Sequence, residues 1–342
     1  MRKNPLYSLL LASVLATTGC ADVTDRNAHA PAMQTHSASP ALKILLTNDD
    51  GLTENIQAMQ AALRAAGHEV VVAIPCQNQS GKGAAANFLT PVGDLTRDCR
   101  GGAAKAGAPG VGPIAALDQA FYVDATPIMA TLYGLDIAAF KTWHSTPDLV
   151  ISGPNEGRNL GAMVISSGTV SNAQIAMSRR IPTLAVSADL NTTDSATLAK
   201  EVASLTVKLL NSLQRNSAHP GQLPHDLALN VNFPKFSAGT SQTLTWRAAR
   251  FGNFEFARAR FVEDLGADPA AAAFGLRDIH QPGISFTLNS KDNVGPEINA
   301  DSEGLLSAQG YVTVTPMQNG YEVAPAQHSE FNNSIRRVLD NL

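Results

Sequence analysis

The residues best suited to chemistry are two adjacent aspartates, Asp49 and Asp50, which follow the apolar segment 43–47 and precede Gly51. Two neighbouring carboxylates at the end of a buried strand repel each other unless a cation neutralises them, and a hard divalent cation takes oxygen ligands. Adjacent side chains of an extended chain point in opposite directions, so both bind one ion only at a bend, which Gly51 permits. The pair therefore predicts a divalent-cation site, with an ordinary turn as the alternative.

Neutral oxygen donors follow two further segments that we predict as strands. Ser80 lies in the loop after the second strand of the chain, and Asn155 lies in the loop after a strand predicted at 148–152. Both side chains can join Asp49 and Asp50 around one ion without adding negative charge. Mg²⁺ or Mn²⁺ is the predicted cofactor, because either ion keeps positions open for water and phosphate.

A second kind of site is indicated by Ser167, Gly168 and Thr169, which precede or begin a helix predicted at 169–180. Backbone amides at a helix N-terminus, with hydroxyl groups beside them, bind anions such as phosphate. An ordinary Ser/Thr helix cap is the alternative interpretation. Lys82 and Arg158 lie in the neighbouring loops and are either phosphate clamps or solvated loop charges.

The pattern of apolar residues predicts alternating strands and helices over 42–234. Strands at 43–47 and 69–74 flank a helix that Gly67 ends, and their uninterrupted apolar character suits a parallel sheet covered on both faces. We therefore predict a Rossmann-like, doubly wound, mostly parallel sheet, whose ligands bind at the carboxyl ends of the strands. The further predicted elements are strand 121–123, helix 126–135, strand 148–152, helix 169–180, strand 182–187, helix 198–209 and strand 227–232.

The alternation of strands and helices is lost after Pro234. We predict that 235–342 is an appended, partly β extension that serves in oligomerisation, with a strand at 311–315 and a closing helix at 329–342. Residues 77–118 lack periodicity, and a loop of that length in a compact domain is usually functional or mobile.

The first twenty residues have the plan of an export signal: Arg2 and Lys3, then the apolar segment 9–16, then small residues ending in Gly19-Cys20. This resembles a bacterial lipoprotein signal, in which Cys20 becomes the lipidated first residue; simple secretion and a chance apolar start are the alternatives. We predict a signal at 1–20, a flexible tether at 21–41, and a periplasmic protein that is anchored to the membrane through Cys20.

Composition narrows the function further. The chain has 342 residues, of which 44% are hydrophobic, enough for a sizeable core in one or two domains. Its 25 basic and 29 acidic residues give a net charge of −4, so no nucleic-acid partner is expected. Export would leave Cys76 and Cys99 as an even pair in an oxidising compartment, which favours a disulfide over two unpaired thiols.

The chain carries several distinctive motifs in order: ILLTNDDG at 44–51, NQSG at 78–81, SGPNEG at 152–157, SGTV at 167–170 and, more weakly, YVTVTP at 311–316. Together they resemble the SurE family of metal-dependent 5′/3′-nucleotidases and phosphatases. The Gly-Pro-Asn and Asn-Gln-Ser-Gly-Lys-Gly segments look closer to the acid-phosphatase-like branch of that family.

The resemblance implies that Asp49, Asp50, Ser80 and Asn155 hold the metal. It also implies that Asn48 lines the phosphate site together with Ser167, Gly168 and Thr169. None of the chain's departures from the family pattern falls on the four implied ligands, so those departures bear on the choice of substrate.

The predicted function is therefore divalent-metal-dependent hydrolysis of phosphomonoesters, with nucleoside monophosphates as the first expected substrates. Asp49 or Asp50 is the predicted general base, and the residues alone do not decide between them. The predicted assembly is a homodimer or a higher homo-oligomer. The alternative is a non-catalytic periplasmic lipoprotein that binds a phosphorylated ligand on the same fold.

Overall fold

The computed structural model describes residues 40–219, 221–292 and 294–321, together with Ile335 and Leu339. The predicted signal, nearly all of the predicted tether and nearly all of the predicted closing helix lie outside the described residues. Among the helices that are described, none is both long enough and apolar enough to cross a membrane.

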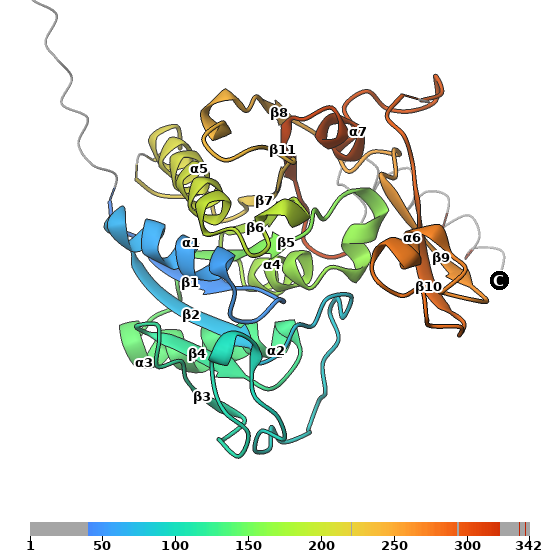
Figure 1. Cartoon of the computed structure of the whole chain (residues 1–342). Helices are drawn as coiled ribbons and strands as arrows, with labels where there is room; N and C mark the ends of the chain where they lie inside the picture. The colour runs from blue at the N-terminus through green and yellow to red at the C-terminus, as the bar shows by residue number, and fades with distance from the viewer. Residues whose placement is uncertain (1–39, 220, 293, 322–334, 336–338, 340–342) are drawn as a thin grey trace, which may run out of the picture. The chain divides into compact units, whose positions relative to one another are not determined.

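A mixed sheet organises the described chain and has nine strands in the order β3-β4-β2-β1-β5-β6-β7-β11-β8 (Figure 1). The six strands from β4 to β7 are parallel, β3 and β11 are antiparallel to their inner neighbours, and β8 is parallel to β11. The strands are β1 (Lys43–Thr47), β2 (Glu69–Pro75), β3 (Val111–Pro113), β4 (Ala120–Val123), β5 (Leu149–Glu156), β6 (Thr183–Ala188), β7 (Ala228–Phe233), β8 (Trp246–Ala248) and β11 (Val312–Pro316).

The chain winds outward from β1 in both directions, which confirms the predicted doubly wound fold. It first passes through β2 and β4 on one side, and it then crosses to β5, which pairs with the other edge of β1 with Thr47 opposite Ser152. From β5 it continues outward through β6 and β7. The switch point between β1 and β5 is where open α/β sheets bind their ligands, at the carboxyl ends of the strands.

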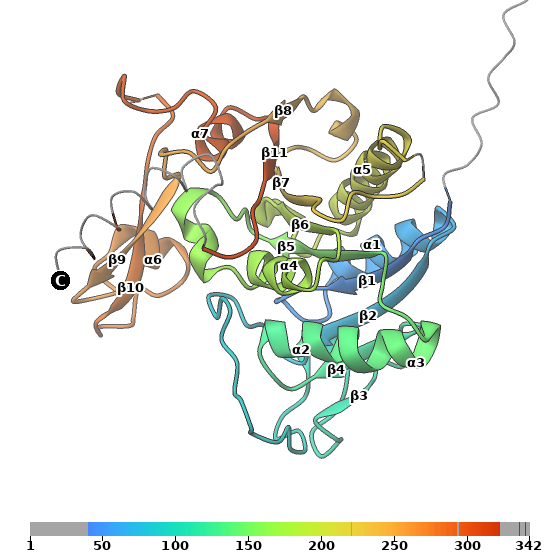
Figure 2. The same cartoon turned by 180° about the vertical axis from the view of Figure 1, so that it is seen from behind.

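Helices cover both faces of the sheet. Helices α1 (Glu54–Ala65) and α5 (Ala196–Arg215) lie together on one face, whereas α2 (Pro127–Tyr133), α3 (Ala139–Trp143) and α4 (Gly168–Ser178) cover the other face (Figures 1 and 2). Because side chains alternate along a strand, Ile44 and Leu46 pack in the core under α1, and Leu45 packs in the core under α3. Short 3-10 turns connect these elements at Arg100–Gly102, Gly161–Ser166, Leu190–Thr192 and Ser241–Thr243.

The helix predicted at 126–135 runs further than expected. Its first part, α2, continues through a π-helical turn at Gly134–Ala138 into α3. Gly134 makes this path possible, because a Cβ atom there would lie only 2.7 Å from the Leu45 side chain in the core. Thr126 precedes the helix in an extended conformation, and its side chain forms no capping hydrogen bond.

The region after Pro234 contributes to the main sheet and also forms a separate hairpin. Strands β11 and β8 extend the sheet beyond β7. Strands β9 (Ala257–Val262) and β10 (Gly283–Leu288) pair only with each other and carry α6 (Pro269–Ala273), away from the sheet in both views (Figures 1 and 2). Helix α7 (Glu303–Ala308) leads into β11.

The buried carboxyl of Glu303 connects this C-terminal part to the core. It accepts hydrogen bonds from the Gly161 amide at 2.8 Å, the Thr315 hydroxyl at 2.6 Å and the Asn230 side chain at 3.1 Å. Burial raises the pKa of Glu303 to about 7, and these hydrogen bonds oppose the effect only in part.

Glu303→Gln is expected to change how stability depends on pH. Between the ordinary pKa of 4.5 and the folded value of about 7, the unfolded chain loses the Glu303 proton while the folded chain keeps it. The wild-type free energy of unfolding therefore falls across this range by up to about 3 kcal/mol relative to the variant. Urea unfolding at pH 4.5 and pH 7.5 measures the difference, with exposed Glu69→Gln as the control. Parallel pH profiles for wild type and Glu303→Gln would contradict the expectation.

Candidate metal and phosphate site

A tight turn directly after β1 presents both aspartates. The Asn48 side chain donates to the Gly51 carbonyl at 2.7 Å and accepts from the Gly51 amide at 3.2 Å, while Gly51 adopts a φ of 84°. Asp49 and Asp50 therefore sit at a bend, as the sequence predicts, and both are buried. The Asn48 side chain stabilises this turn, so its observed role is in shaping the site.

The N-terminus of α4 packs directly against Asp49. The Thr169 hydroxyl donates to Asp49 Oδ1 at 2.7 Å, and Ser167 caps the helix by accepting the Val170 amide at 3.1 Å. A Cβ atom on Gly168 would lie 2.6 Å from Asp49 Cβ. Only glycine at position 168 leaves room for this carboxylate at the helix end. Three of the four residues predicted to line the phosphate site, those at this helix end, are therefore brought close to Asp49.

The loop after β2 and the carboxyl end of β5 are joined to the same turn. Asn155, which the sequence predicts in a loop, lies within β5, because that strand continues past an irregularity after Ser152 and pairs with β6 as far as Glu156. Asp50 Oδ2 accepts the Glu156 amide at 2.9 Å, and Asp50 Oδ1 accepts the Asn78 side chain at 3.2 Å. The Gln79 amide donates to the Asp49 carbonyl at 2.8 Å. These bonds fix the orientation of Asp50 and bring all three predicted loops to one edge of the sheet.

Asn155 and Ser80 stand in different environments at this edge. The side-chain nitrogen of Asn155, Nδ2, donates to the Gly157 carbonyl at 2.8 Å. The side-chain oxygen Oδ1 is buried and has no hydrogen-bond partner among the described residues. Ser80 is exposed, and its backbone amide donates to Asn78 Oδ1 at 2.9 Å. Asn155 thus offers an unused buried oxygen, while Ser80 lies on the solvent side of the same loop that contacts Asp49.

The two buried carboxylates are only partly compensated, because the Arg100 guanidinium lowers the pKa of Asp50 less than burial and the neighbouring carboxylates raise it. Burial raises the pKa of Asp49, and it raises the pKa of Asp50 well above its ordinary value, with the Asp49 and Glu156 carboxylates adding to the rise. In the described parts of the chain, no Lys, Arg or His side chain forms an ion pair with either carboxylate. A bound cation would remove this imbalance.

The donor set suits a hard divalent cation. The described residues contain no cluster of three or more His, Cys, Asp and Glu side chains, so a zinc-type site is not indicated there. The available donors are all oxygen atoms and carry little charge: two carboxylates, the unpartnered Asn155 oxygen and the Ser80 hydroxyl. Such a set suits Mg²⁺ or Mn²⁺, which keeps further coordination positions open for water or substrate. The residues present therefore fit the predicted cofactor.

The N-terminus of α4 offers unpaired backbone amides next to the two aspartates. In the part of the chain that the structure describes, neither the Gly168 nor the Thr169 amide has a hydrogen-bond partner, as expected of the first turn of a helix. Both residues are buried beside Asp49. The two amides and the helix dipole together favour a negatively charged group at this position.

The two predicted clamp residues differ in placement. Lys82 is exposed in its loop. Arg158 is largely buried, where it pairs with Asp189 at 3.2 Å, donates to the Ser307 hydroxyl at 3.0 Å and lies 4.6 Å from the centre of the Phe256 ring. Arg158 thus connects the core to the C-terminal part, and this explains why it is unavailable as a loop charge.

The sequence prediction missed three residues that contact Asp50: Asn78, Glu156 and Arg100. Arg100 donates to the Asp50 carbonyl at 2.9 Å and to the Glu156 carboxylate at 2.7 Å. Asn78 and Glu156 lie within motifs that the sequence singled out, so their positions could have been weighed. Arg100 lies in the aperiodic loop, where only its position next to Cys99 marked it.

Comparison with known proteins identifies the family. The family model for survival protein SurE matches residues 44–257. A 5′/3′-nucleotidase SurE from Serratia proteamaculans is 32% identical over 278 residues, which cover 81% of this chain and 90% of that protein. The chain belongs to the SurE family. An acid phosphatase from Yarrowia lipolytica is 31% identical over 67% of this chain and 68% of its own length.

The fold comparison agrees with the assignment to the SurE family. The crystal structure of the SurE protein from Aquifex aeolicus matches with a TM-score of 0.60 and 24% sequence identity, over 86% of this chain and 99% of that chain. At this level of identity the match supports the architecture alone: a mostly parallel sheet with a C-terminal β region.

Gly168→Ala is expected to weaken cation binding by at least about tenfold, because its Cβ atom would displace the Asp49 carboxylate. The same close contact lowers stability as well, so urea unfolding of the variant establishes that it is folded under the conditions of the titration. Calorimetric titration with Mn²⁺ measures the affinity. Gly93→Ala is the matched control, since a Cβ atom there meets no atom within 4 Å. Equal Mn²⁺ affinity in Gly168→Ala and wild type would contradict the assigned geometry.

Proposed function

We propose that this chain is a divalent-metal-dependent phosphomonoester hydrolase, acting first of all as a 5′/3′-nucleotidase on nucleoside monophosphates. One observation supports this proposal above the others: the Asp49–Asp50 pair lies against the open amide end of α4. A cation at the carboxylates and a phosphate at the amides would be immediate neighbours. That juxtaposition suits a reaction in which a phosphoryl group is held beside a metal ion.

The relatives support the same class of reaction. The proteins from Serratia and Yarrowia carry the names 5′/3′-nucleotidase and acid phosphatase, and both names describe phosphomonoester hydrolysis. A SurE protein from Sorangium cellulosum, 38% identical over 210 residues, is named a 5′-nucleotidase. Nucleoside monophosphates are therefore the first substrates to test, before other phosphomonoesters.

The residues of the chain divide the work of the reaction. A bound Mg²⁺ or Mn²⁺ supplies Lewis acidity to the phosphoryl group and lowers the pKa of water. The Gly168 and Thr169 amides hold a phosphoryl oxygen at the end of α4. Asp50 has both carboxylate oxygens engaged, by the Asn78 side chain and the Glu156 amide.

Asp49 is better placed than Asp50 to accept a proton. Its Oδ1 is oriented by the Thr169 hydroxyl, and no other residue in the described chain donates to Oδ2. We therefore assign the general-base role to Asp49 and an orienting, metal-holding role to Asp50.

Phosphate release from AMP and from p-nitrophenyl phosphate tests this function. Turnover is expected with Mg²⁺ or Mn²⁺ and is expected to vanish with chelator. Asp50→Asn should lower kcat/KM by at least about a hundredfold, because the substitution removes one of the two negative charges that attract the cation. Asp118→Asn is the control, since Asp118 pairs with Arg64 on the surface. A folded protein that binds phosphate but shows no turnover with any divalent metal would favour the alternative, a non-catalytic periplasmic binding lipoprotein.

We infer that the protein is exported, held at the periplasmic membrane surface through Cys20, and self-associated as a homodimer or larger. The Cys76–Cys99 disulfide supports export, because such bonds persist in oxidising compartments. Exposed apolar side chains on the β9–β10 hairpin support self-association: Phe261 is 70% exposed, Ile284 58% and Leu288 60%.

Both inferences are measurable on protein made with its own leader. Mass spectrometry should find an N-terminus that begins at Cys20 and carries acyl groups, and Cys20→Ala should be released from the membrane fraction. Light scattering should give at least twice the monomer mass, and a Phe261→Ser/Ile284→Ser double variant should give a smaller assembly. An unprocessed N-terminus would contradict the first inference, and a monomeric wild type would contradict the second.

A further inference from the structure

The Arg100 side chain, the Glu156 side chain and the turn at Asp50 form a closed ring of hydrogen bonds beside the candidate metal ligands. Arg100 Nη1 donates to the Asp50 carbonyl at 2.9 Å, and its Nη2 donates to Glu156 Oε2 at 2.7 Å. The Glu156 backbone amide returns to Asp50 Oδ2 at 2.9 Å. Arg100 thus holds the backbone of Asp50, Glu156 holds its side chain, and the Arg100 and Glu156 side chains also bind each other.

The ring controls the charge around the phosphate position. The carboxylates of Asp49, Asp50 and Glu156 influence one another, and the Glu156 side chain is only 10% exposed. In the described residues, Arg100 is the cationic side chain that pairs with Glu156. Without it, a third carboxylate would stand unpaired next to the site that must accept a phosphate dianion, and like charges at short range repel strongly in a partly buried environment.

The disulfide places Arg100 at this edge of the sheet. Cys99 is bonded to Cys76 at the end of β2, and the Arg100 amide donates to the Cys76 carbonyl at 2.9 Å. Gly101 follows with a φ of 64°, and a Cβ atom there would lie 2.5 Å from the Leu52 carbonyl. Position 101 therefore needs glycine for the chain to pass this close to the turn after Asp50.

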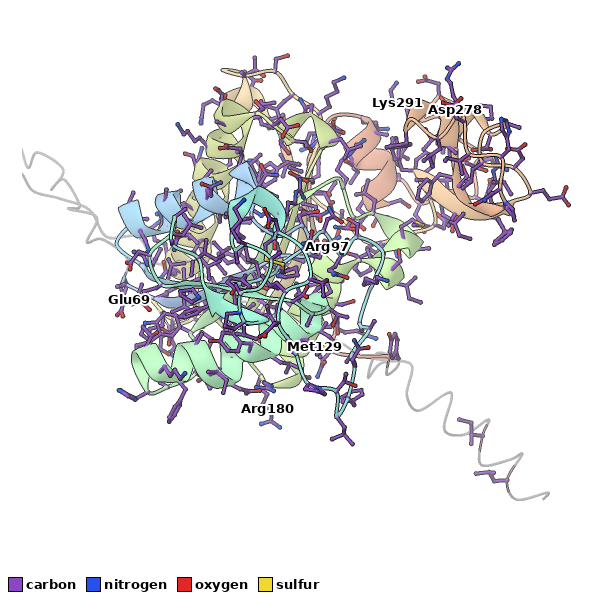
Figure 3. The ribbon with its side chains drawn as sticks, turned by 60° about the horizontal axis from the view of Figure 1, so that its bottom comes forward. Glu69, Arg97, Met129, Arg180, Asp278 and Lys291 are labelled. Atoms are coloured by element: carbon purple, nitrogen blue, oxygen red, sulfur yellow. A yellow bond between two sulfur atoms is a disulfide. The ribbon has the colours of Figure 1, made fainter. Side chains whose placement is uncertain are left out.

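The loop that the disulfide closes is otherwise lightly tied. Residues 84–94 are mostly exposed, with Phe88 at 84% and Leu89 at 106% exposure. The Asn87 backbone amide donates a hydrogen bond to the sulfur of Met129 in α2. Figure 3 labels Met129, and it also labels Arg97, which lies in the same loop as Asn87. The cross-link at the base of this loop holds Arg100 against Asp50 and Glu156 together with hydrogen bonds beside it, such as the one from the Gln77 side chain to the Asp98 carbonyl at 2.7 Å.

We propose that Arg100 is a positioning residue of the phosphatase site: it neutralises Glu156 beside the Asp50 turn so that phosphate can bind, and the Cys76–Cys99 disulfide holds it there. This inference rests on the proposed phosphomonoesterase function. Arg100 acts through Glu156 and Asp50, and the substrate is held by other groups. The effect of losing Arg100 on phosphate binding should therefore depend on whether the Glu156 charge is present.

Arg100→Gln distinguishes this charge role from a merely structural one. Loss of the positive charge should weaken inorganic phosphate binding by about tenfold, because Glu156 is left unpaired. The same loss should leave Mn²⁺ binding as tight as in wild type or tighter, because the site becomes more negative. Electron paramagnetic resonance measures free Mn²⁺, and calorimetry on the Mn²⁺-loaded protein measures phosphate. A structural disruption would weaken both ligands together and would overturn the proposal.

Two further comparisons complete the test. The double variant Arg100→Gln/Glu156→Gln should recover most of the lost phosphate affinity, and Arg100→Lys, which keeps the charge, should lose less than Arg100→Gln. Arg64→Gln is the matched control, because Arg64 also joins a carboxylate, that of Asp118, to a backbone carbonyl, that of Val70, but away from the site. It should leave both affinities unchanged. Failure of the double variant to recover phosphate binding would overturn the charge-neutralising role.

The role of the disulfide is tested with the double variant Cys76→Ser/Cys99→Ser. This variant should lose phosphate affinity as Arg100→Gln does, while it still binds Mn²⁺. Unchanged phosphate affinity in this variant would overturn the role given to the disulfide. A wild-type protein that binds neither Mn²⁺ nor phosphate would refute the proposed function itself. A wild type that binds both, with Arg100→Gln identical to it, would refute only the role of Arg100.

Discussion

The site depends on the burial of two adjacent carboxylates at the end of β1. Burying a carboxylate without a charge partner costs several kcal/mol, so the surrounding structure is arranged to tolerate Asp49 and Asp50. The end of α4 approaches Asp49 closely enough that position 168 must be glycine, while the Asn78 side chain and the Glu156 backbone amide hold Asp50. These contacts lower the cost without cancelling the charge, and the remaining imbalance is what supports the proposal of a divalent-cation site.

A chain of buried hydrogen bonds extends from Asp49 to the C-terminal strands. Asn159 Nδ2 donates to the Thr169 hydroxyl at 3.3 Å, which leaves the hydroxyl proton directed at Asp49. The Asn159 carbonyl accepts the Asn230 side chain at 3.0 Å, and Asn230 also binds Glu303. The C-terminal region therefore does more than lengthen the sheet: through Glu303 it fixes the asparagine that orients the Thr169 proton toward Asp49.

Local patterns in the sequence predicted much of the fold and of the site, whereas features that arise from packing left no such signal. Apolar runs and helical spacing identified the parallel strands and their winding, and the polar residues after each strand identified Asp49, Asp50 and Asn155. The extension of α2 through Gly134 and the three-residue strand β3 have no periodic signal. The sequence did not indicate Arg100, because its position depends on a disulfide and on Gly101. The sequence also did not decide whether Arg158 is a phosphate clamp or a solvated charge, because its partners Asp189 and Ser307 are distant in sequence.

The proposed cation and phosphate sites are immediate neighbours, and this constrains the residues around them. Carboxylates that attract a divalent cation also repel a phosphate group next to it, so an additional acidic side chain would weaken phosphate binding unless it is neutralised. Glu156 is such an acid: its backbone amide is needed to orient Asp50, but its side chain adds negative charge. A guanidinium bonded to both Glu156 and the Asp50 turn resolves this conflict without competing for the cation, and the cross-linked loop is the element of the chain that brings it there.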